Sequence, residues 1–525
     1  MNRRRTWTAA VLSIVTAAAV VLADRVLPPP EPAPAAVPSV AEVATAGAWT
    51  CAVGDARAGT ELAVTAARPG ELGAGPGVVE LYALAADEAD PVSLPPVFPG
   101  AHVRTGLEGD QDTATFARWR EAPVAVAREW RLDEGDDLPP ATVAGPCASA
   151  WSDRWVLPGM STDGGNDARL RIANPFPTDA TVAVGFVTPQ GPQEPLALQN
   201  LTVPADGTLE LPVTESMPEQ PDLSAVVRVL SGRAVVEGYQ LASSEIGGID
   251  GASLLGASPA SAETWTVPWV SGREGDASWL WIVNLGDRPA PVELTLHTAE
   301  GGVPPEGLPE VTVAPGQLRR VDLRGTFPEG VTAGALTARS DGTPIHVAGA
   351  VQRSDEDPAR TGFAVQLGAP EADDTWVASG GDTTGRLERL DVVNTGSETS
   401  RFTVTLFNGS TVLRPAELAE LEVAPGQHLS VPLSEALGEV GDWSAQLAVD
   451  EGAPVVVGRV GIRRADALHL VAHAATPEAA WSPSNVPVPV RAEPGIVQRL
   501  GADGDPSVPD APSLDAPPAA DGAAG

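Results

Sequence analysis

The chain repeats itself with a period of about 110 residues, and this internal repeat limits its possible folds more than any other feature of the sequence. Three copies each open with a tryptophan, namely Trp155, Trp265 and Trp376. A short apolar segment that ends in asparagine follows in each copy, at Asn174, Asn284 and Asn394. Because a repeat of this length forms one structural unit, the sequence predicts a series of similar units.

Later landmarks of the copies keep the same register. A turn containing proline lies between two strand-like segments in each copy: LTVPADGTLELPV, VTVAPGQLRRVDL and LEVAPGQHLSVPL. A long hairpin, such as AQLAVDEGAPVVVGRVGIR, then closes the copy. A fourth, more divergent copy precedes these three, since Trp49 opens it and TFARWREAPVAVAREWRL matches the closing hairpin.

The segments between the turns predict an all-β protein. They often alternate in polarity, and Gly, Pro, Asn and Asp separate them, which is typical of short strands joined by turns. About seven or eight such strands per copy match an immunoglobulin-like β-sandwich, so we expect a tandem array of four sandwiches. In the alternative arrangement each copy forms two blades, and the four copies close into a β-propeller-like toroid.

The aligned residues have structural interpretations first. We expect Trp49, Trp155, Trp265 and Trp376 to cap the core of each copy or to seal its junction with the preceding one. A stacking platform for sugars is the functional alternative. The three aligned asparagines end strands, where an Asn side chain favours a turn by bonding to the backbone nearby.

The repeat pattern as a whole resembles a family of secreted or membrane-anchored actinobacterial proteins of unknown function. It is also similar to bacterial surface repeats with the pattern L-R-I-x-N … V-x-V … G … L-x-V-P-A-G … V-x-S-x-x-P-V-V. The resemblance extends from about Trp49 to Trp481 and is weakest in the first copy. It implies a role in the cell envelope and carries no catalytic residue over to this chain.

The N-terminus predicts export. Arg3, Arg4 and Arg5 precede an uncharged apolar run from Thr6 to Ala23, and positive charge remains on the cytoplasmic side of a membrane. This run is long enough for a membrane anchor, but a cleaved signal peptide stays open. The predicted segments are a cytoplasmic stub (1–5), the anchor or signal (6–23), a Pro-rich spacer (24–48), copy 1 (49–150), copy 2 (151–262), copy 3 (263–373), copy 4 (374–480) and a Pro/Ala/Asp-rich disordered tail (481–525).

Charge and cysteine content narrow the possible partners. The net charge of −36 and the absence of a basic cluster beyond the N-terminus argue against nucleic acid. Cys51 and Cys147 are the two cysteines, and an even pair in an oxidising compartment predicts a disulfide. Since one lies at the opening and the other at the closing segment of copy 1, the bond is expected to staple that copy shut.

Motifs that carry chemistry are missing from the sequence. The six histidines do not form a zinc pattern, and Gly159-Met160-Ser161-Thr162-Asp163 lacks the last glycine of a nucleophile elbow. We therefore predict no catalytic residue, no cofactor and no metal site. The expected function is that of a non-enzymatic extracytoplasmic cell-envelope protein acting as an interaction or scaffolding surface, tethered through residues 6–23 or secreted. The alternative is a module that binds envelope carbohydrate through exposed tryptophans, and the expected partners are envelope proteins or glycans.

Overall fold

The computed structural model describes residues 46–54, 60–70, 75–84, 92–107, 114–132, 141–149, 151–242, 251–353, 362–463, 470–477 and 480. The chain divides into two compact units, Met1–Val43 and Ala44–Gly525, and all of the described residues belong to the second. The stub predicted at 1–5, the apolar segment at 6–23, the spacer up to residue 45 and the tail at 481–525 lie outside them. Within the described part, no helix has the length and apolar character needed to cross a membrane.

The described residues form an all-β structure. Copy 1 consists of β1 (Ala46–Cys51), β2 (Thr60–Arg68), β3 (Val78–Ala83), β4 (Val92–Ser93), β5 (Ala101–Leu107), β6 (Thr115–Arg120), β7 (Ala125–Leu132) and β8 (Ala141–Pro146). Copy 2 consists of β9 (Arg154–Met160), β10 (Asp167–Asn174), β11 (Ala180–Thr188), β12 (Gly191–Gln193), β13 (Leu201–Val203), β14 (Gly207–Pro212), β15 (Leu223–Ser231), β16 (Val235–Ala242) and β17 (Gly251–Leu255), with two short helices, η1 (Leu196–Leu198) and α2 (Val213–Ser216).

Copies 3 and 4 repeat the pattern of copy 2. Copy 3 consists of β18 (Thr264–Ser271), β19 (Ala277–Asn284), β20 (Ala290–Thr298), β21 (Gly301–Val303), β22 (Val311–Val313), β23 (Gln317–Asp322), β24 (Ala333–Ser340), β25 (His346–Arg353) and β26 (Gly362–Leu367). Copy 4 consists of β27 (Thr375–Gly381), β28 (Arg386–Val393), β29 (Ser400–Asn408), β30 (Thr411–Leu413), η3 (Ala416–Leu418), β31 (Leu421–Val423), β32 (His428–Pro432), α4 (Ser434–Leu437), β33 (Trp443–Glu451), β34 (Val456–Arg463), β35 (Leu470–Ala474) and β36 (Thr476–Pro477).

Each copy contains two antiparallel sheets with a constant strand order. In copy 3 the first sheet runs β21-β20-β24-β18, with β22 on β20, and the second runs β23-β19-β25-β26. We call these the Trp sheet, which contains the opening tryptophan strand, and the hairpin sheet, which contains the hairpin β25–β26. The closing hairpin predicted from AQLAVDEGAPVVVGRVGIR is wrong, because its two strands lie in different sheets: β33 in the Trp sheet of copy 4 and β34 in the hairpin sheet. Trp265 and Leu296 of the Trp sheet share a buried cluster with Ile282 and Val347 of the hairpin sheet, so the two sheets pack together.

The strand order differs from that of an immunoglobulin domain. There the second strand joins the first and fifth in one sheet, whereas here β18, β20 and β24 form one sheet and β19 lies in the other. The chain crosses between the sheets from β18 to β19 and from β19 to β20, stays in the Trp sheet through β21 and β22, and crosses again at β23, β24 and β25. The hairpin β25–β26 then stays in one sheet. Turn spacing predicts the number of strands and leaves this order open, because the same turns can join strands within a sheet or between sheets.

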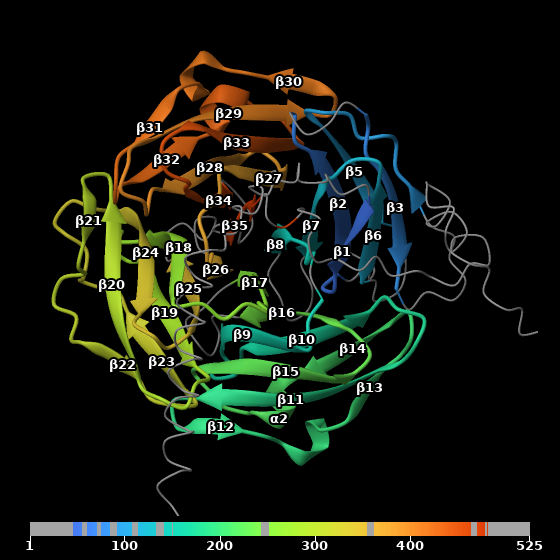
Figure 1. Cartoon of the computed structure of the whole chain (residues 1–525), viewed down its shortest axis with the longest axis vertical. Helices are drawn as coiled ribbons and strands as arrows, with labels where there is room; N and C mark the ends of the chain where they lie inside the picture. Colours follow the sequence, from blue (N-terminus) through green and yellow to red (C-terminus); the bar gives the residue numbers. More distant parts are fainter. Residues whose placement is uncertain are drawn as a thin grey trace, which may run out of the picture. The chain divides into compact units, whose positions relative to one another are not determined.

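The copies close on one another within the unit Ala44–Gly525 (Figure 1). Their last strands form a cycle of contacts, since β8 contacts β17, β17 contacts β26, β26 contacts β35 and β35 contacts β8. The tryptophan strand of one copy also packs on the hairpin sheet of the next: β9 on β19 and β25, β18 on β28 and β34, and β27 on β2 and β7. The described part is therefore all-β, with several antiparallel sheets, and the last strands of the four copies contact one another in a cycle.

Candidate functional site

The four opening tryptophans are buried and do the same work in every copy. Their side chains are at most 1% exposed. Each indole Nε1 donates to the backbone carbonyl of the residue just before β7, β16, β25 or β34 of the hairpin sheet. The bonds run from Trp49 to Val124 at 2.8 Å, Trp155 to Ala234 at 3.0 Å, Trp265 to Ile345 at 2.7 Å and Trp376 to Val455 at 2.8 Å. They join the two sheets of a copy, so these four are not the exposed aromatic residues that a stacking platform needs.

The aligned asparagines each organise a turn. Asn284 is fully buried, and its Nδ2 donates to the carbonyls of Arg288 at 2.7 Å and Val313 at 3.0 Å. Its Oδ1 accepts the N–H of Gly286 at 2.8 Å. Asn174 and Asn394 make the corresponding bonds in their copies. The partners are Thr178, Val203 and Phe176 for Asn174, and Glu398, Val423 and Gly396 for Asn394.

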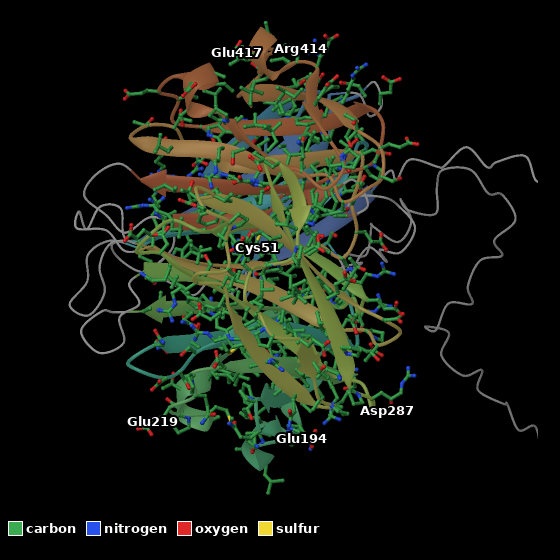
Figure 2. The ribbon with its side chains drawn as sticks, turned by 90° about the vertical axis from the view of Figure 1, so that its left-hand side faces the viewer. Cys51, Glu194, Glu219, Asp287, Arg414 and Glu417 are labelled. Atoms are coloured by element: carbon green, nitrogen blue, oxygen red, sulfur yellow. A yellow bond between two sulfur atoms is a disulfide. The ribbon has the colours of Figure 1, made fainter. Side chains whose placement is uncertain are left out.

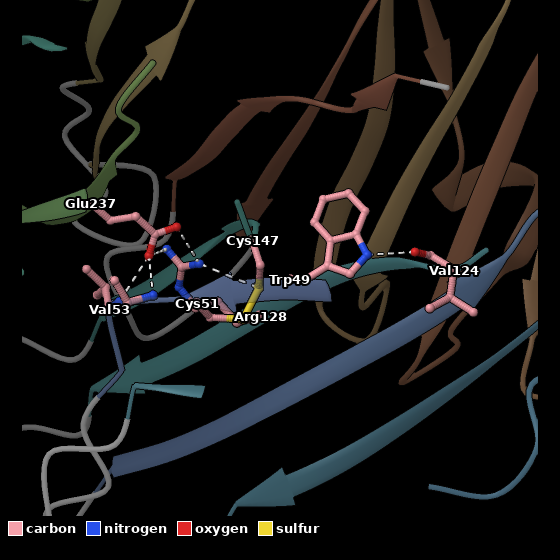
Figure 3. The surroundings of a disulfide bond; sticks show 8 residues. Trp49, Cys51, Val53, Val124, Arg128, Cys147 and Glu237 are labelled. Carbon is pink, nitrogen blue, oxygen red and sulfur yellow. Dashed lines mark hydrogen bonds and ion pairs between the residues drawn. A yellow bond between two sulfur atoms is a disulfide. The ribbon is translucent and has the colours of Figure 1, made fainter. Parts of the chain in front are cut away.

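The predicted disulfide between Cys51 and Cys147 is present (Figure 3). Its Cα atoms are 4.6 Å apart, and the side chains are 1% and 4% exposed. Next to it, the backbones of Thr50 and Ala148 exchange two hydrogen bonds of 2.8 and 2.9 Å. The bond therefore joins the opening strand of copy 1 to the segment that follows β8, as the sequence predicted.

A buried ion pair beside the disulfide joins copy 1 to copy 2. Arg128 contacts both carboxylate oxygens of Glu237, at 3.1 and 3.0 Å (Figure 3). The same carboxylate accepts the backbone N–H groups of Ala52 at 2.7 Å and Val53 at 3.0 Å. Burial raises the pKa of Glu237, and the guanidinium and the two N–H groups oppose that rise. The sequence does not reveal this pair, because Arg128 and Glu237 are far apart in the chain and match no motif.

A second buried charge cluster joins copy 4 back to copy 1. Glu129 lies 2.7 Å from Arg131, 3.2 Å from Arg104 and 3.3 Å from Arg386 of copy 4. Arg131 in turn lies 3.3 Å from Asp382 of copy 4. Burial would raise the pKa of Glu129, but the surrounding arginines, Arg386 foremost, hold it well below its usual range. This carboxylate therefore remains ionised and links the ends of the cycle.

The described histidines also serve the structure. Nδ1 of His297 lies 3.0 Å from the carbonyl of Gly426 in the next copy. Nε2 of His428 lies 2.9 Å from the buried carboxylate of Asp391. Within the described ranges, no group of three or more His, Cys, Asp or Glu residues is arranged to hold a metal ion.

Two hollows are candidates for ligand binding. The first, of about 310 Å³, lies where the last strands of all four copies meet, and its lining is largely apolar, with Leu254, Leu367 and Val471 among it. The second, of about 490 Å³, lies between copies 2 and 3 and is lined by Gln240, Trp279, Trp281, Arg320, Gln352 and Phe363. Neither was predicted, although the pair Trp279 and Trp281 breaks the repeat pattern and was visible in the aligned copies.

Exposed acidic residues lie on the outside of the described unit. Glu194, Glu219, Asp287 and Glu417 project outward in Figure 2, whereas Cys51 lies inside. Their separation along the chain spreads the negative charge, which keeps such a surface soluble and self-repelling.

A match to a protein family extends over most of the repeated region. Residues 113–274 and 246–494 match the model of a family of unknown function (DUF5719). The chain belongs to this family. Both DUF5719 matches span more than one copy, as expected if the family is defined by repeated units that pack on their neighbours. No curated protein matches the sequence.

Proposed function

We propose that this DUF5719 protein is a non-enzymatic, extracytoplasmic cell-envelope protein that acts as an interaction or scaffolding surface. The observation that carries the proposal is that its buried charged groups form ion pairs between copies. Arg128 with Glu237, and Glu129 with Arg386, hold copies together across their junctions. A charged group in such an ion pair serves to hold the copies together. A partner can therefore bind at the outer surface or in the two hollows.

The compartment in this proposal rests on the cysteine pair and the N-terminal sequence. A structural disulfide between Cys51 and Cys147 is typical of oxidising compartments. Arg3 to Arg5 followed by the apolar run 6–23 supports export, with the run serving as anchor or as cleaved signal. Protease added to intact spheroplasts is expected to degrade the repeats, and their protection would contradict this orientation. A mature N-terminus at Asp24 would replace the anchor with a cleaved signal.

The scaffolding role is tested by capture from envelope extracts. The immobilised full chain is expected to retain the same envelope protein or glycan in repeated experiments. The same chain, reduced, unfolded and alkylated at Cys51 and Cys147, serves as the control of equal charge, because it presents the same residues without the folded surface. Retention of identical material by both forms, or of none by the folded form, would contradict the proposal.

A second candidate function is the binding of envelope carbohydrate. The observation that favours it is the hollow between copies 2 and 3, whose lining combines three aromatic rings with three side-chain amides and with the charged groups of Asp163, Arg320 and Arg324. Sugar sites combine such groups, because sugars present hydroxyls at their edges and apolar C–H groups on their faces. This candidate differs from the expected platform of exposed tryptophans, since Trp279 is only 3% exposed.

A further inference from the structure

The last strands of the four copies enclose the apolar hollow of about 310 Å³, which we call the central hollow. The strands β8, β17, β26 and β35 contact one another in a closed cycle, and all four supply lining residues (Figure 1). An alanine or a glycine lines the central hollow in every copy, at Ala144, Ala252, Gly368 and Ala472. Such short side chains leave space unfilled, whereas leucine, valine and tryptophan fill the cores of the copies.

Direct contacts between copies fix the walls of the central hollow. The hydroxyl of Ser253 in copy 2 accepts the backbone N–H of Val365 in copy 3 at 2.7 Å. Leu254 of copy 2 packs over Gly145 of copy 1, where a Cβ would lie 2.6 Å from the leucine side chain. On the other side, β35 contacts both β26 and β8. The space between the four strands is therefore preformed.

The central hollow extends along the strands and opens where they end. Its lining runs from Thr142 to Pro146 on β8 and from Leu470 to Ala474 on β35. Four residue steps of a strand extend about 13 Å. Thr142 and Leu470 are buried, Pro146 and Ala474 are half-buried, and Glu371 beyond the strand ends is exposed. A long space that opens at this end suits an extended chain better than a globular ligand.

Polar groups contribute little to the accessible lining. Four polar side chains of the lining are bonded to the protein, namely Glu237, Ser253, Gln366 and His473. Nε2 of His473 and Oε1 of Gln366 lack a partner among the described residues, but these atoms have almost no accessible surface and offer nothing to a ligand. A ligand would be held mainly by apolar contact, whose strength is roughly proportional to the apolar area removed from water.

Negative charge lies at the opening of the central hollow. Glu371 and Asp373, in the segment between β26 and β27, both belong to the lining. No arginine is among the described residues of this lining. An anionic head group at the opening would therefore meet like charge, which disfavours its binding.

We propose that the central hollow binds the aliphatic chain of an amphiphile whose head group carries no negative charge. The chain lies among Leu254, Leu367 and Val471, and the head group stays at the opening beside Glu371. Apolar cavities hold water poorly and take up apolar ligands, and a volume of about 310 Å³ lies within the usual range for small-ligand sites. This inference rests on the proposed function in treating the protein as one that binds other molecules, and it names a ligand class for one of the two hollows.

The test is calorimetric titration of the full chain with 1-hexanol, 1-octanol and 1-decanol. Each added methylene that is buried is expected to tighten binding about 4-fold. Decanoate carries a carboxylate on a chain of the same length, so it is expected to bind more weakly than decanol.

Two variants alter the central hollow. Leu367→Asn replaces a half-buried leucine of the lining with a polar side chain of similar size, and it is expected to weaken decanol binding about 5- to 20-fold. The matched control is Leu387→Asn, because Leu387 is 49% exposed on β28 and does not line the central hollow. Its binding is expected to equal that of the wild type. Ala474→Phe places a ring in the space near the opening, so it is expected to weaken the binding of decanol more than that of hexanol.

All variants keep the apolar run 6–23, so binding of an alcohol to that run cannot produce a difference between them. Thermal unfolding shows whether each variant is folded. No binding of octanol or decanol by the folded wild type would overturn the proposal. So would equal binding by Leu367→Asn and Leu387→Asn, an unchanged dependence on chain length in Ala474→Phe, or tighter binding of decanoate than of decanol. Capture of an envelope partner by a chain that binds no alcohol would remove this site and leave the proposed function standing.

Discussion

Removal of the disulfide is expected to destabilise the protein through the unfolded chain. The bond joins residues 96 positions apart, and the chain-entropy argument gives about 4–5 kcal/mol for a loop of this length. In the double variant Cys51→Ala and Cys147→Ala, the paired backbones of Thr50 and Ala148 still hold the two segments together in the folded state. The folded structure is thus expected to survive, and the loss to appear in the free energy of unfolding.

The assay is urea unfolding followed by tryptophan fluorescence, with the variant compared with the oxidised wild type. The expected loss is about 3–5 kcal/mol, because the lost contact of each small buried side chain adds little to the chain-entropy effect. A single variant, Cys147→Ala, shows whether the remaining thiol matters. A difference below about 1 kcal/mol would refute the reasoning, since the loop would then not be restrained by the bond in the unfolded chain.

Two further predictions concern single side chains. Asn284→Asp places a carboxylate where Nδ2 now donates to two backbone carbonyls. Urea unfolding is expected to show a loss of about 2–4 kcal/mol in the free energy of unfolding. A loss no larger than that of an Asn→Asp change at an exposed position would contradict this. Burial lowers the pKa of His473 to about 3 and that of His346 to about 4, whereas an unfolded histidine titrates near about 6.5. The unfolded state then binds more protons below about pH 6.5, so stability is expected to fall on acidification from pH 7 to about 5, and less steeply in His473→Gln; a flat profile over this range would argue against neutral buried histidines.

The repeat made much of the architecture predictable. Landmarks such as Trp265 and Asn284 recur because each copy needs the same bond between sheets and the same turn. The disulfide was also predictable, because Cys51 and Cys147 lie at the two ends of one copy. Features that depend on local pattern were therefore accessible from the chain alone.

Features that depend on how copies meet were not accessible in the same way. The ion pair between Glu129 and Arg386 joins residues 257 positions apart, and neither residue belongs to a motif. The strand order could not be predicted either, because turns of the same composition can join strands within one sheet or between two sheets. The sequence contains one sign of the hollow between copies 2 and 3, which is the replacement of charged residues by Trp279 and Trp281 in copy 3. The fold is needed to see that Gln240 of the preceding copy lines the same hollow.

The closure of copy 4 on copy 1 is tested most directly by a double-mutant cycle on Glu129 and Arg386. Their charged groups lie 3.3 Å apart, with side chains 1% and 5% exposed. The coupling free energy is obtained from urea unfolding of Glu129→Gln, Arg386→Gln and the double variant. The exposed pair Glu194 and Arg228 serves as the control, for which a coupling of about 0–1 kcal/mol is expected. Closed copies predict a coupling of about 1–3 kcal/mol between Glu129 and Arg386, even though other arginines surround the carboxylate. Additive effects within about 0.5 kcal/mol would show that the first and last copies do not meet.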